Sequence, residues 1–448
     1  MEICTIGGYE EVGKNMTAVK VGEDVILFDG GLHIPAVMEL QEQENNIRYT
    51  EQMLRKVKAI PNDLVLDKLG WTDKVRAIVV SHAHLDHVGG IPYLAQRYPR
   101  ASVIGSPFTI AVLESILNDE KLKMRNRLVK VQPNSSLEVK GKNGKIKLEF
   151  VHTTHSTLQC LFVAWHSLEG TVFYALDFKF DNHPIIGEGP NYKRLKEIGK
   201  KGVKLLIVDS LYSGTDRRTA SERIASNLVE DAISNSRDRN AALFITTFSS
   251  HIARLKSIVE YGQKTRRKII FLGRSLNKYV NSAIEVGLCP FKNKVELVKY
   301  RRQIDALLKK IEKERGRYLI VCTGHQAEPG SILDRIVQDE TPFHFNNGDN
   351  VIFSSSIIPT ATNINAREIM DRRLRKKGVR LQTDIHVSGH GGREDLRDLI
   401  ELLKPKHIVP AHGTLQQETP MAELGAEMGY KIGETVHLSS NGKTFKIN

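Results

Sequence analysis

The sequence predicts an α/β protein with two domains, one of which interrupts the other. Three observations support this. Apolar runs that end in Asp or His recur as far as Asp209, strands and helices alternate after it, and the first pattern returns after Arg380. Strands that carry reactive residues at their C-terminal ends, on loops held by a rigid sheet, are typical of α/β enzymes. A chain of 448 residues is long enough for such an arrangement.

The first part of the chain is rich in predicted strands. Each apolar run leads into a polar loop, as in VILFDGG, AIVVSH, KIKLEFVH, TVFYALDF and KLLIVDS. Helical patterns lie between them, near residues 91–98 and 110–117. Residues 33–60 form a charged insertion that we expect to be helical, with no role indicated by its composition.

The middle part alternates regularly. The runs AALFITTF, KIIFLGR and RYLIVCTG are strand candidates, and the first two lead into helical patterns, which predicts a parallel sheet. The last part has a helix near 393–403, the strand KHIVPA and a terminal hairpin around Asn441-Gly442. We place the domain boundaries at 1–208, 209–375 and 376–448.

Composition excludes several classes of protein. Apolar residues make up 40% of the chain and charged residues 26%, which is ordinary globular composition. No run approaches the roughly 18 apolar residues that a membrane span needs, and the N-terminus does not resemble a signal peptide. Four widely spaced cysteines suggest neither a disulfide framework nor a cysteine zinc site. These features predict a cytoplasmic protein without a membrane partner.

The net charge of +13 is concentrated in one region. Between Arg254 and Arg317 there are 18 Lys or Arg against 6 Asp or Glu. Such a basic surface suits a polyanion such as RNA or DNA. An ordinary solvated surface explains the charge equally well, so charge alone does not settle the partner.

The sharpest chemical signal is HAHLDH at residues 82–87. It places three histidines and an aspartate within six residues, directly after an apolar strand. Zinc favours imidazole and carboxylate ligands, and a short loop can direct side chains toward two neighbouring ions. A single histidine would more often be structural, but four such residues in one loop indicate a metal site.

Two ions need more ligands than this loop supplies. We expect the others at later strand ends, and we prefer His155 to the nearby His152 because Ser156 follows it. The predicted zinc ligands are His82, His84 and His155 for one ion, Asp86, His87 and His412 for the other, and Asp177 bridging both. Asp29, which ends an earlier strand, is expected to orient a ligand histidine rather than to bind metal. Two such ions can share and acidify a water molecule, and manganese or magnesium could replace zinc in assays.

These motifs resemble those of a known family. HAHLDHVGG matches the HxHxDH signature of the metallo-β-lactamase superfamily, and Asp29, His155, Asp177 and His412 look like its other motifs. Asp209, His390 and His412 resemble the three motifs of the β-CASP branch, which processes nucleic acids. TTFSSHIAR, CTGHQAEPGS, FSSSIIP and HVSGHGG are most similar to the ribonuclease J family. The chain resembles the shorter archaeal form of that family.

The resemblance implies an αββα sandwich interrupted by a β-CASP α/β domain with a parallel sheet. It implies zinc-dependent, mainly 5′-to-3′ hydrolysis of single-stranded RNA, two zinc ions per chain and a homodimer. Asp86, His390 and Asp209 are expected to be catalytic, with His390 as a general acid for the leaving 3′ oxygen. The expected pocket for the 5′ phosphate consists of Ser249, Ser250, His251, His386, Val387, Ser388, Gly389 and His390. Ser250 has an alternative role as a simple helix cap.

Three alternatives remain open at this point. One is an endoribonuclease of the cleavage-factor type, and a second is a small-molecule thioesterase or lactonase on the same metal core. The third is an inactive RNA-binding or scaffold subunit. The β-CASP resemblance and the basic region argue against the second alternative, and the complete ligand set argues against the third.

Overall fold

The chain forms two α/β units in the computed structural model, which describes residues 1–43, 48–236, 238–358 and 361–448. Unit 1 comprises residues 1–181, 189–219 and 389–448, and unit 2 comprises residues 182–188 and 220–388. One unit is therefore inserted into the other along the sequence. Residues 44–47 of the insertion predicted at 33–60 lie outside the described residues.

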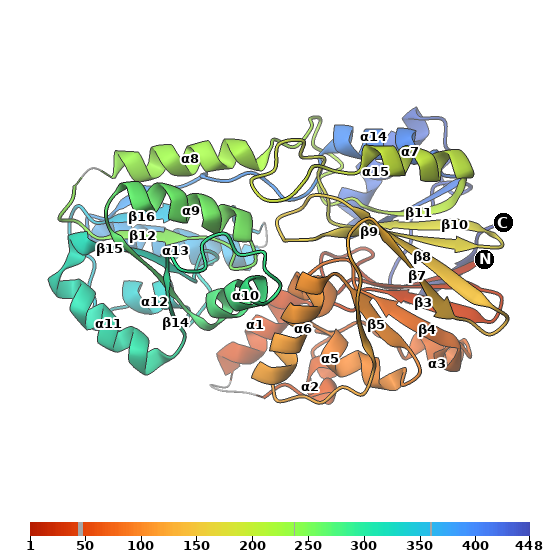
Figure 1. Cartoon of the computed structure of the whole chain (residues 1–448), viewed down its shortest axis with the longest axis horizontal. Coiled ribbons are helices and arrows are strands. Elements are labelled where there is room, and N and C mark those ends of the chain that lie inside the picture. The colour runs from red at the N-terminus through yellow and green to blue at the C-terminus, as the bar shows by residue number, and fades with distance from the viewer. Residues whose placement is uncertain (44–47, 237, 359–360) are drawn as a thin grey trace. The chain divides into compact units, whose positions relative to one another are not determined.

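Unit 1 contains two sheets that pack face to face, with helices on both outer faces (Figure 1). The first sheet has the order β19-β1-β2-β3-β4-β5-β6 and the second β18-β11-β10-β9-β8-β7. The strands are β1 (Glu2–Gly7), β2 (Met16–Val21), β3 (Asp24–Phe28), β4 (Val75–Val79), β5 (Ser102–Gly105), β6 (Leu128–Lys130), β7 (Ser135–Lys140), β8 (Lys145–His152), β9 (Leu161–Ser167), β10 (Gly170–Ala175), β11 (Val203–Asp209), β18 (His407–Ala411) and β19 (Lys443–Lys446). This is the αββα sandwich that the sequence predicts.

The helices of unit 1 follow from local signals and burial. Ser106, for example, caps its helix by accepting a hydrogen bond from the backbone N–H of Thr109, and Pro107 occupies the first turn. The helices are α1 (Ile34–Gln43), α2 (Glu51–Lys56), α3 (Val65–Lys68), α4 (Leu85–Val88), α5 (Ile91–Leu94), α6 (Pro107–Asp119), α7 (Tyr192–Lys201), α14 (Arg393–Leu403) and α15 (Leu415–Glu427). Single 3₁₀ turns occur at 72–74 and 95–97.

Two apolar cores hold unit 1 together. One lies between the sheets and includes Phe28, Phe150, Trp165 and Tyr174. The other lies between the second sheet and helices α7, α14 and α15. Alternate residues of strands such as β8 and β10 contribute to opposite cores, as the two-residue period of a strand requires.

Unit 2 has one six-stranded sheet in the order β14-β13-β15-β12-β16-β17, in which every pair is parallel. Its strands are β12 (Leu243–Thr246), β13 (Lys268–Leu272), β14 (Glu296–Val298), β15 (Tyr318–Cys322), β16 (Asn350–Phe353) and β17 (Arg380–Gln382). Its helices are α8 (Glu222–Asn235), α9 (Ile252–Lys264), α10 (Arg274–Glu285), α11 (Arg301–Lys313), α12 (Ile332–Val337) and α13 (Ala361–Lys376), with a 3₁₀ turn at 315–317. The predicted parallel sheet is confirmed.

The predicted terminal hairpin is wrong. Strand β19 pairs antiparallel with β1 in the first sheet, whereas Val436 forms a bridge to Ile408 of the second sheet. The turn at Asn441-Gly442 therefore carries the chain from one sheet to the other. An Asn-Gly pair predicts a tight turn but does not specify which strands lie on either side.

None of the helices in the described residues combines the length and the hydropathy that a bilayer crossing requires.

Candidate metal centre

The loop 82–87 follows β4 and runs directly into the short helix α4. His82 and His87 are fully buried. The loop packs against the loop that follows β3 so closely that a Cβ at Gly31 would lie 1.7 Å from the carbonyl oxygen of Asp86. A glycine at position 31 is therefore required for this approach, which fixes the ligand loop to the first sheet.

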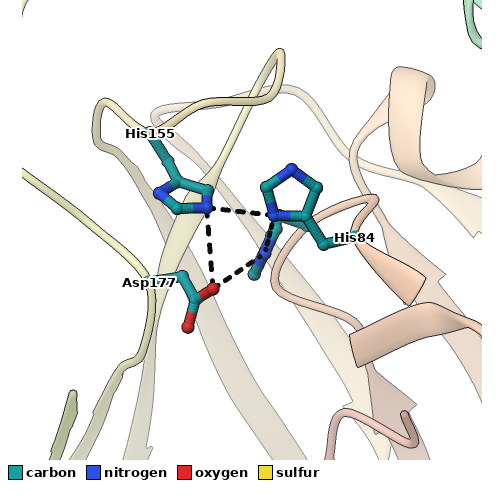
Figure 2. A group of neighbouring side chains, drawn as sticks. His84, His155 and Asp177 are labelled. Carbon is teal, nitrogen blue, oxygen red and sulfur yellow. Dashed lines mark hydrogen bonds and ion pairs between the residues drawn. The ribbon is translucent and has the colours of Figure 1, made fainter. Parts of the chain in front are cut away.

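One set of predicted ligands converges on a single point. His84 Nδ1 lies 3.2 Å from His82 Nε2 and 3.0 Å from His155 Nε2. Asp177 Oδ2 lies 3.4 Å from His82 Nε2 and 3.5 Å from His155 Nε2. Figure 2 shows the side chains of His84, His155 and Asp177 pointing toward one another. His152, the competing candidate, belongs to none of the three groups of potential metal ligands that the described residues form.

The second set lies beside the first and shares one carboxylate with it. Asp177 Oδ2 is 3.2 Å from His87 Nε2, and Asp177 Oδ1 is 3.6 Å from His412 Nε2. Asp86 Oδ2 is 3.6 Å from His87 Nε2 and 3.9 Å from His412 Nε2. The structure therefore brings all seven predicted ligands together in two groups, with Asp177 common to both.

This geometry fits metal ions. Ligand atoms about 2.0–2.1 Å from a tetrahedral zinc lie about 3.3 Å from one another, close to the separations above. The buried Asp177 Oδ1 has no hydrogen-bond partner among the described residues. No Lys or Arg in that part of the chain forms an ion pair with Asp86 or Asp177, although both carboxylates lie in this site. A cation would satisfy these oxygens.

The other ring nitrogen of several histidines is held by an acceptor. His87 Nδ1 donates to Asp29 Oδ2 at 2.8 Å, and Asp29 also accepts hydrogen bonds from Ser81 and Tyr174. His155 Nδ1 donates to the carbonyl oxygen of Gly389 at 2.7 Å. Such contacts fix the tautomer, so that Nε2 presents its lone pair to the ligand group.

Gly389 is essential to this contact. A Cβ at this position would lie 2.6 Å from Ser156 Oγ and 2.9 Å from the His155 ring. Only glycine lets the backbone of residue 389 approach this loop. Gly389, expected in the pocket for the 5′ phosphate, thus contacts a loop that carries a predicted metal ligand.

The electrostatics of the site are those of an anion-rich cluster. Burial lowers the pKa of His84 and of His155, which favours the neutral rings that bind metal. Burial also opposes the protonation of His87, but Asp177 and two further carboxylates outweigh it and raise the pKa of His87. This concentration of negative charge attracts a proton when no other cation is present.

His390 lies at the edge of the cluster. Its Nδ1 donates to Asp209 Oδ2 at 2.7 Å, and its Nε2 lies 3.7 Å from Asp177 Oδ2. Burial alone would lower the pKa of His390, but Asp177 and Asp209 raise it to about 9. The ring stacks on His412 with centroids 5.4 Å apart. These two carboxylates therefore favour a protonated imidazole next to the ligand groups.

The other predicted substrate residues lie in unit 2, on two segments. Ser249, Ser250 and His251 connect β12 to α9, while His386, Val387 and Ser388 follow β17. His251 occupies the N-cap of α9 and makes no side-chain capping bond. The alternative in which Ser250 caps this helix is therefore not what the structure shows.

Arg254 and Glu222 connect these two segments, a role that no sequence pattern indicates. Arg254 is fully buried and forms a bidentate pair with Glu222, at 2.6 and 2.9 Å. Its Nη1 also donates to the carbonyl oxygens of Ser354 and Ile385. Arg254 thus fixes the backbone that leads into His386.

This finding corrects part of the charge interpretation. Arg254 and Arg267 both belong to the basic stretch, but Arg254 is fully buried and Arg267 is 9% exposed. Arg267 donates to the carbonyl oxygens of Ala241, Tyr318 and Asp238. These two guanidinium groups support the fold, so they are not part of a nucleic-acid surface.

Comparison with known proteins adds to this geometry. The metallo-beta-lactamase superfamily matches residues 9–165, the ribonuclease J beta-CASP domain matches 240–371, and the Zn-dependent metallo-hydrolase RNA specificity domain matches 378–437. Ribonuclease J of Pyrococcus abyssi is 41% identical over 448 residues, covering 100% of this chain and 97% of that protein. Ribonuclease J of Methanocaldococcus jannaschii is 38% identical, covering 99% and 98%. A crystal structure of a protein of unknown function from Enterococcus faecalis V583 shares the fold, with a TM-score of 0.64, 19% identity and 99% of both chains covered.

The fold and the site together define a metallo-β-lactamase hydrolase with an inserted β-CASP domain. Within that class, the full-length identities to the two archaeal relatives are decisive. The chain belongs to the ribonuclease J family of metal-dependent ribonucleases.

Proposed function

We propose that this protein is a 5′-to-3′ exoribonuclease that uses two zinc ions to hydrolyse single-stranded RNA. The observation that carries the proposal is the pair of ligand groups that share Asp177, with the His390–Asp209 pair beside them. The family establishes a metal-dependent ribonuclease. The direction of attack, the metal and the number of ions go beyond it.

Seven residues would hold the two ions. His82, His84 and His155 belong to one site, Asp86, His87 and His412 to the other, and Asp177 reaches both. When bound, two such ions acidify a shared water molecule and offset negative charge on a phosphodiester. The ligands come from four separate loops fixed to two sheets, so the protein sets the spacing of the site before any ion binds.

His390 is suited to proton transfer. Asp209 holds its Nδ1, so Nε2 is the atom that faces the ligand groups. A protonated Nε2 would donate its proton to the 3′ oxygen that leaves when the phosphodiester bond breaks. Asp209 stabilises the protonated ring and fixes its orientation, in the manner of the aspartate in a His–Asp pair. Asp86 would act through the metal that it binds.

Unit 2 offers donors for a phosphorylated 5′ end. Open parallel sheets bind ligands at the carboxyl ends of their strands. In the described part of unit 2, three buried residues that end or follow adjacent strands have side-chain atoms without hydrogen-bond partners, Thr246 at β12, His325 after β15 and Ser355 after β16. These groups, with Ser249 and Ser250, support a polar subsite in this unit.

The exposed basic residues of unit 2 would contact the RNA backbone. Helix α11 carries exposed Arg302, Lys309 and Lys313, and Lys292 and Lys294 precede it. Contacts of this kind are independent of base sequence, as processive degradation requires.

End-labelled RNA tests the proposal directly. A 5′-labelled single strand should release labelled mononucleotide from the first time point, and more rapidly with a 5′ monophosphate than with a 5′ hydroxyl. Discrete internal fragments at early times would instead identify the cleavage-factor type of endonuclease. If labelled dinucleotides or longer products appear, and only at late times, this would also contradict exonucleolytic attack from the 5′ end.

Elemental analysis tests the metal. The purified protein should contain two zinc ions per chain, and dialysis against a chelator should abolish cleavage until zinc or manganese is returned.

Three further expectations stay predictions. The oligomeric mass would test the homodimer, cell fractionation would test the cytoplasmic location, and limited proteolysis would test the domain boundaries at 209 and 375.

A further inference from the structure

Asn15 occupies a central position under the second ligand group, although no metal-binding pattern includes it. It precedes β2 and its side chain is fully buried. Its backbone N–H donates to the carbonyl oxygen of Asp86, and its own carbonyl accepts from Gly31. The residue thus connects the first loop of the chain to the HxHxDH loop.

The side-chain amide contacts three of the residues assigned as ligands. Its Oδ1 accepts a hydrogen bond from His412 Nδ1 at 2.9 Å. Its Nδ2 donates to the carbonyl oxygen of Asp86 at 3.1 Å and lies 3.1 Å from His87 Nε2. All three of these residues belong to the same ligand group.

The backbone of His412 needs neighbouring contacts to hold its conformation. Its backbone has a φ of 59°, a region that non-glycine residues seldom adopt, so neighbouring contacts must hold it there. Among the described residues, Asn15 provides the hydrogen bond to its Nδ1, and Gly8 accepts from its backbone N–H. With Nδ1 protonated, Nε2 is free to bind a cation.

The first ligand group is held by other residues. His82 Nδ1 lies 3.0 Å from Ser81 Oγ, and His155 Nδ1 donates to Gly389. The amide of Asn15 makes no hydrogen bond to His82, His84 or His155 in the described structure. Asp29 contacts both groups, directly at His87 and through Ser81 at His82, whereas the Asn15 amide contacts the second group alone.

From this asymmetry we propose that Asn15 is a positioning residue for one ion only, the ion held by Asp86, His87 and His412. It makes the affinities of the two sites separable, because removing the amide frees the His412 ring and removes one of the two hydrogen bonds to the Asp86 carbonyl, while no hydrogen bond of the other group is lost. The inference rests on the two-ion site of the proposed function.

The test is a zinc titration of chelator-treated Asn15→Ala against a competing chromophoric chelator, with Asn126→Ala as the matched control. Asn126 is also a buried asparagine of unit 1, and its amide donates to the carbonyl oxygens of Tyr98 and Ala101. Urea unfolding of both metal-free variants measures the cost of losing a buried amide.

Asn15→Ala should lower the affinity of one of the two ions by about 10- to 100-fold, as is typical when a residue that supports a ligand is lost. The other ion should stay within about threefold of wild type, and Asn126→Ala should bind both ions normally. Equal weakening of both ions, or no weakening, would overturn the inference, as would the same loss in Asn126→Ala. A wild-type protein that binds one ion would contradict the two-ion site itself, and Asn15 would then be judged by whether its variant weakens that ion.

Discussion

Two sites in the molecule hold carboxylates away from solvent in different ways. In unit 2 the protein supplies the cation itself, since buried Arg254 pairs with buried Glu222. In unit 1, Asp86 and Asp177 have only histidines nearby, and no Lys or Arg pairs with them among the described residues. Because Arg254 neutralises Glu222, this pair needs no further ligand and has a structural role. Asp86 and Asp177 have no such partner in the described part of the chain, so a cation from solution would neutralise them, as the proposed metal site requires.

Removing a ligand should have the largest effect. His84→Ala or Asp86→Ala should lower RNA cleavage by about 1,000-fold or more, because charge stabilisation by a metal contributes several kcal/mol. The circular dichroism spectrum should be unchanged, and the initial rate with 5′-labelled RNA measures the loss. Turnover near the wild-type value in either variant would show that cleavage does not depend on a cation bound at Asp86 and Asp177. The contrast with the Arg254–Glu222 pair would then fail.

Breaking the pair of unit 2 should cost stability instead. Arg254→Met leaves Glu222 buried without a partner and should lower the free energy of unfolding by about 3–5 kcal/mol. Urea denaturation measures this loss, and Arg254→Met/Glu222→Met should recover most of it. Lys264→Met is the control, because its pair with Glu230 is solvent-exposed and its loss should leave the free energy of unfolding almost unchanged. A double variant as unstable as the single one would show that the guanidinium contacts with Ser354 and Ile385 dominate.

Sequence reasoning succeeded where the signal was local. The ligands of the HxHxDH loop are close together in the chain, and the others end apolar strands, so each has a recognisable neighbourhood. The order of layers follows from the same strand pattern. Asn15 and Arg254 were missed because their roles depend on partners far along the chain, 397 residues away for His412 and 131 for Ile385. Nothing in the sequence around Asn15 or Arg254 indicates such contacts.

The terminal hairpin failed for a related reason. The dipeptide at 441–442 specifies a turn, but strand pairing is decided by the free edge of β1, which β19 joins. The charge count failed at Arg254 and Arg267 because a count cannot distinguish a solvated guanidinium from one that binds buried carbonyl oxygens.

The general acid should have an intermediate effect. His390→Ala should lower the turnover number by about 100-fold, at the lower end of general acid catalysis, and change RNA affinity by less than about threefold. Single-turnover kinetics and fluorescence anisotropy separate the two quantities. His152→Ala, a half-buried histidine outside both ligand groups, should leave both unchanged. Equal losses of turnover and affinity would show that His390 anchors the substrate.

The smallest expected effect concerns Glu418, a buried acid that is neutralised in a third way, by protonation. Glu418 of α15 is fully buried, and its Oε2 has no hydrogen-bond partner within the described chain. Burial, together with Glu10, raises its pKa to about 8 from an ordinary value of 4.5. A proton therefore neutralises buried Glu418, whereas Arg254 neutralises Glu222 and a bound cation would neutralise Asp177.

The sign of its pH dependence follows. The unfolded chain ionises this group near pH 4.5 and the folded protein near pH 8, so stability falls as pH rises between these values and levels off above them. Glu418→Gln keeps the acceptor for the Glu10 backbone N–H and should raise stability at pH 8 by about 1–2 kcal/mol, with little gain at pH 4. Thermal melts at both pH values measure this, with exposed Glu423→Gln of the same helix as control. An equal gain in stability at both pH values would show that Glu418 is not protonated in the folded protein.

The division of unit 1 along the sequence has a consequence for biosynthesis. The HxHxDH loop emerges from the ribosome early, but His390 and His412 lie in the last segment, after the whole of unit 2. Until that segment has emerged, a growing chain lacks one proposed ligand of the second ion, the proposed proton donor and the strand β18 that borders β11. Under the proposed mechanism, such a chain should not attack nearby transcripts, its own message included, until the segment after unit 2 has been translated.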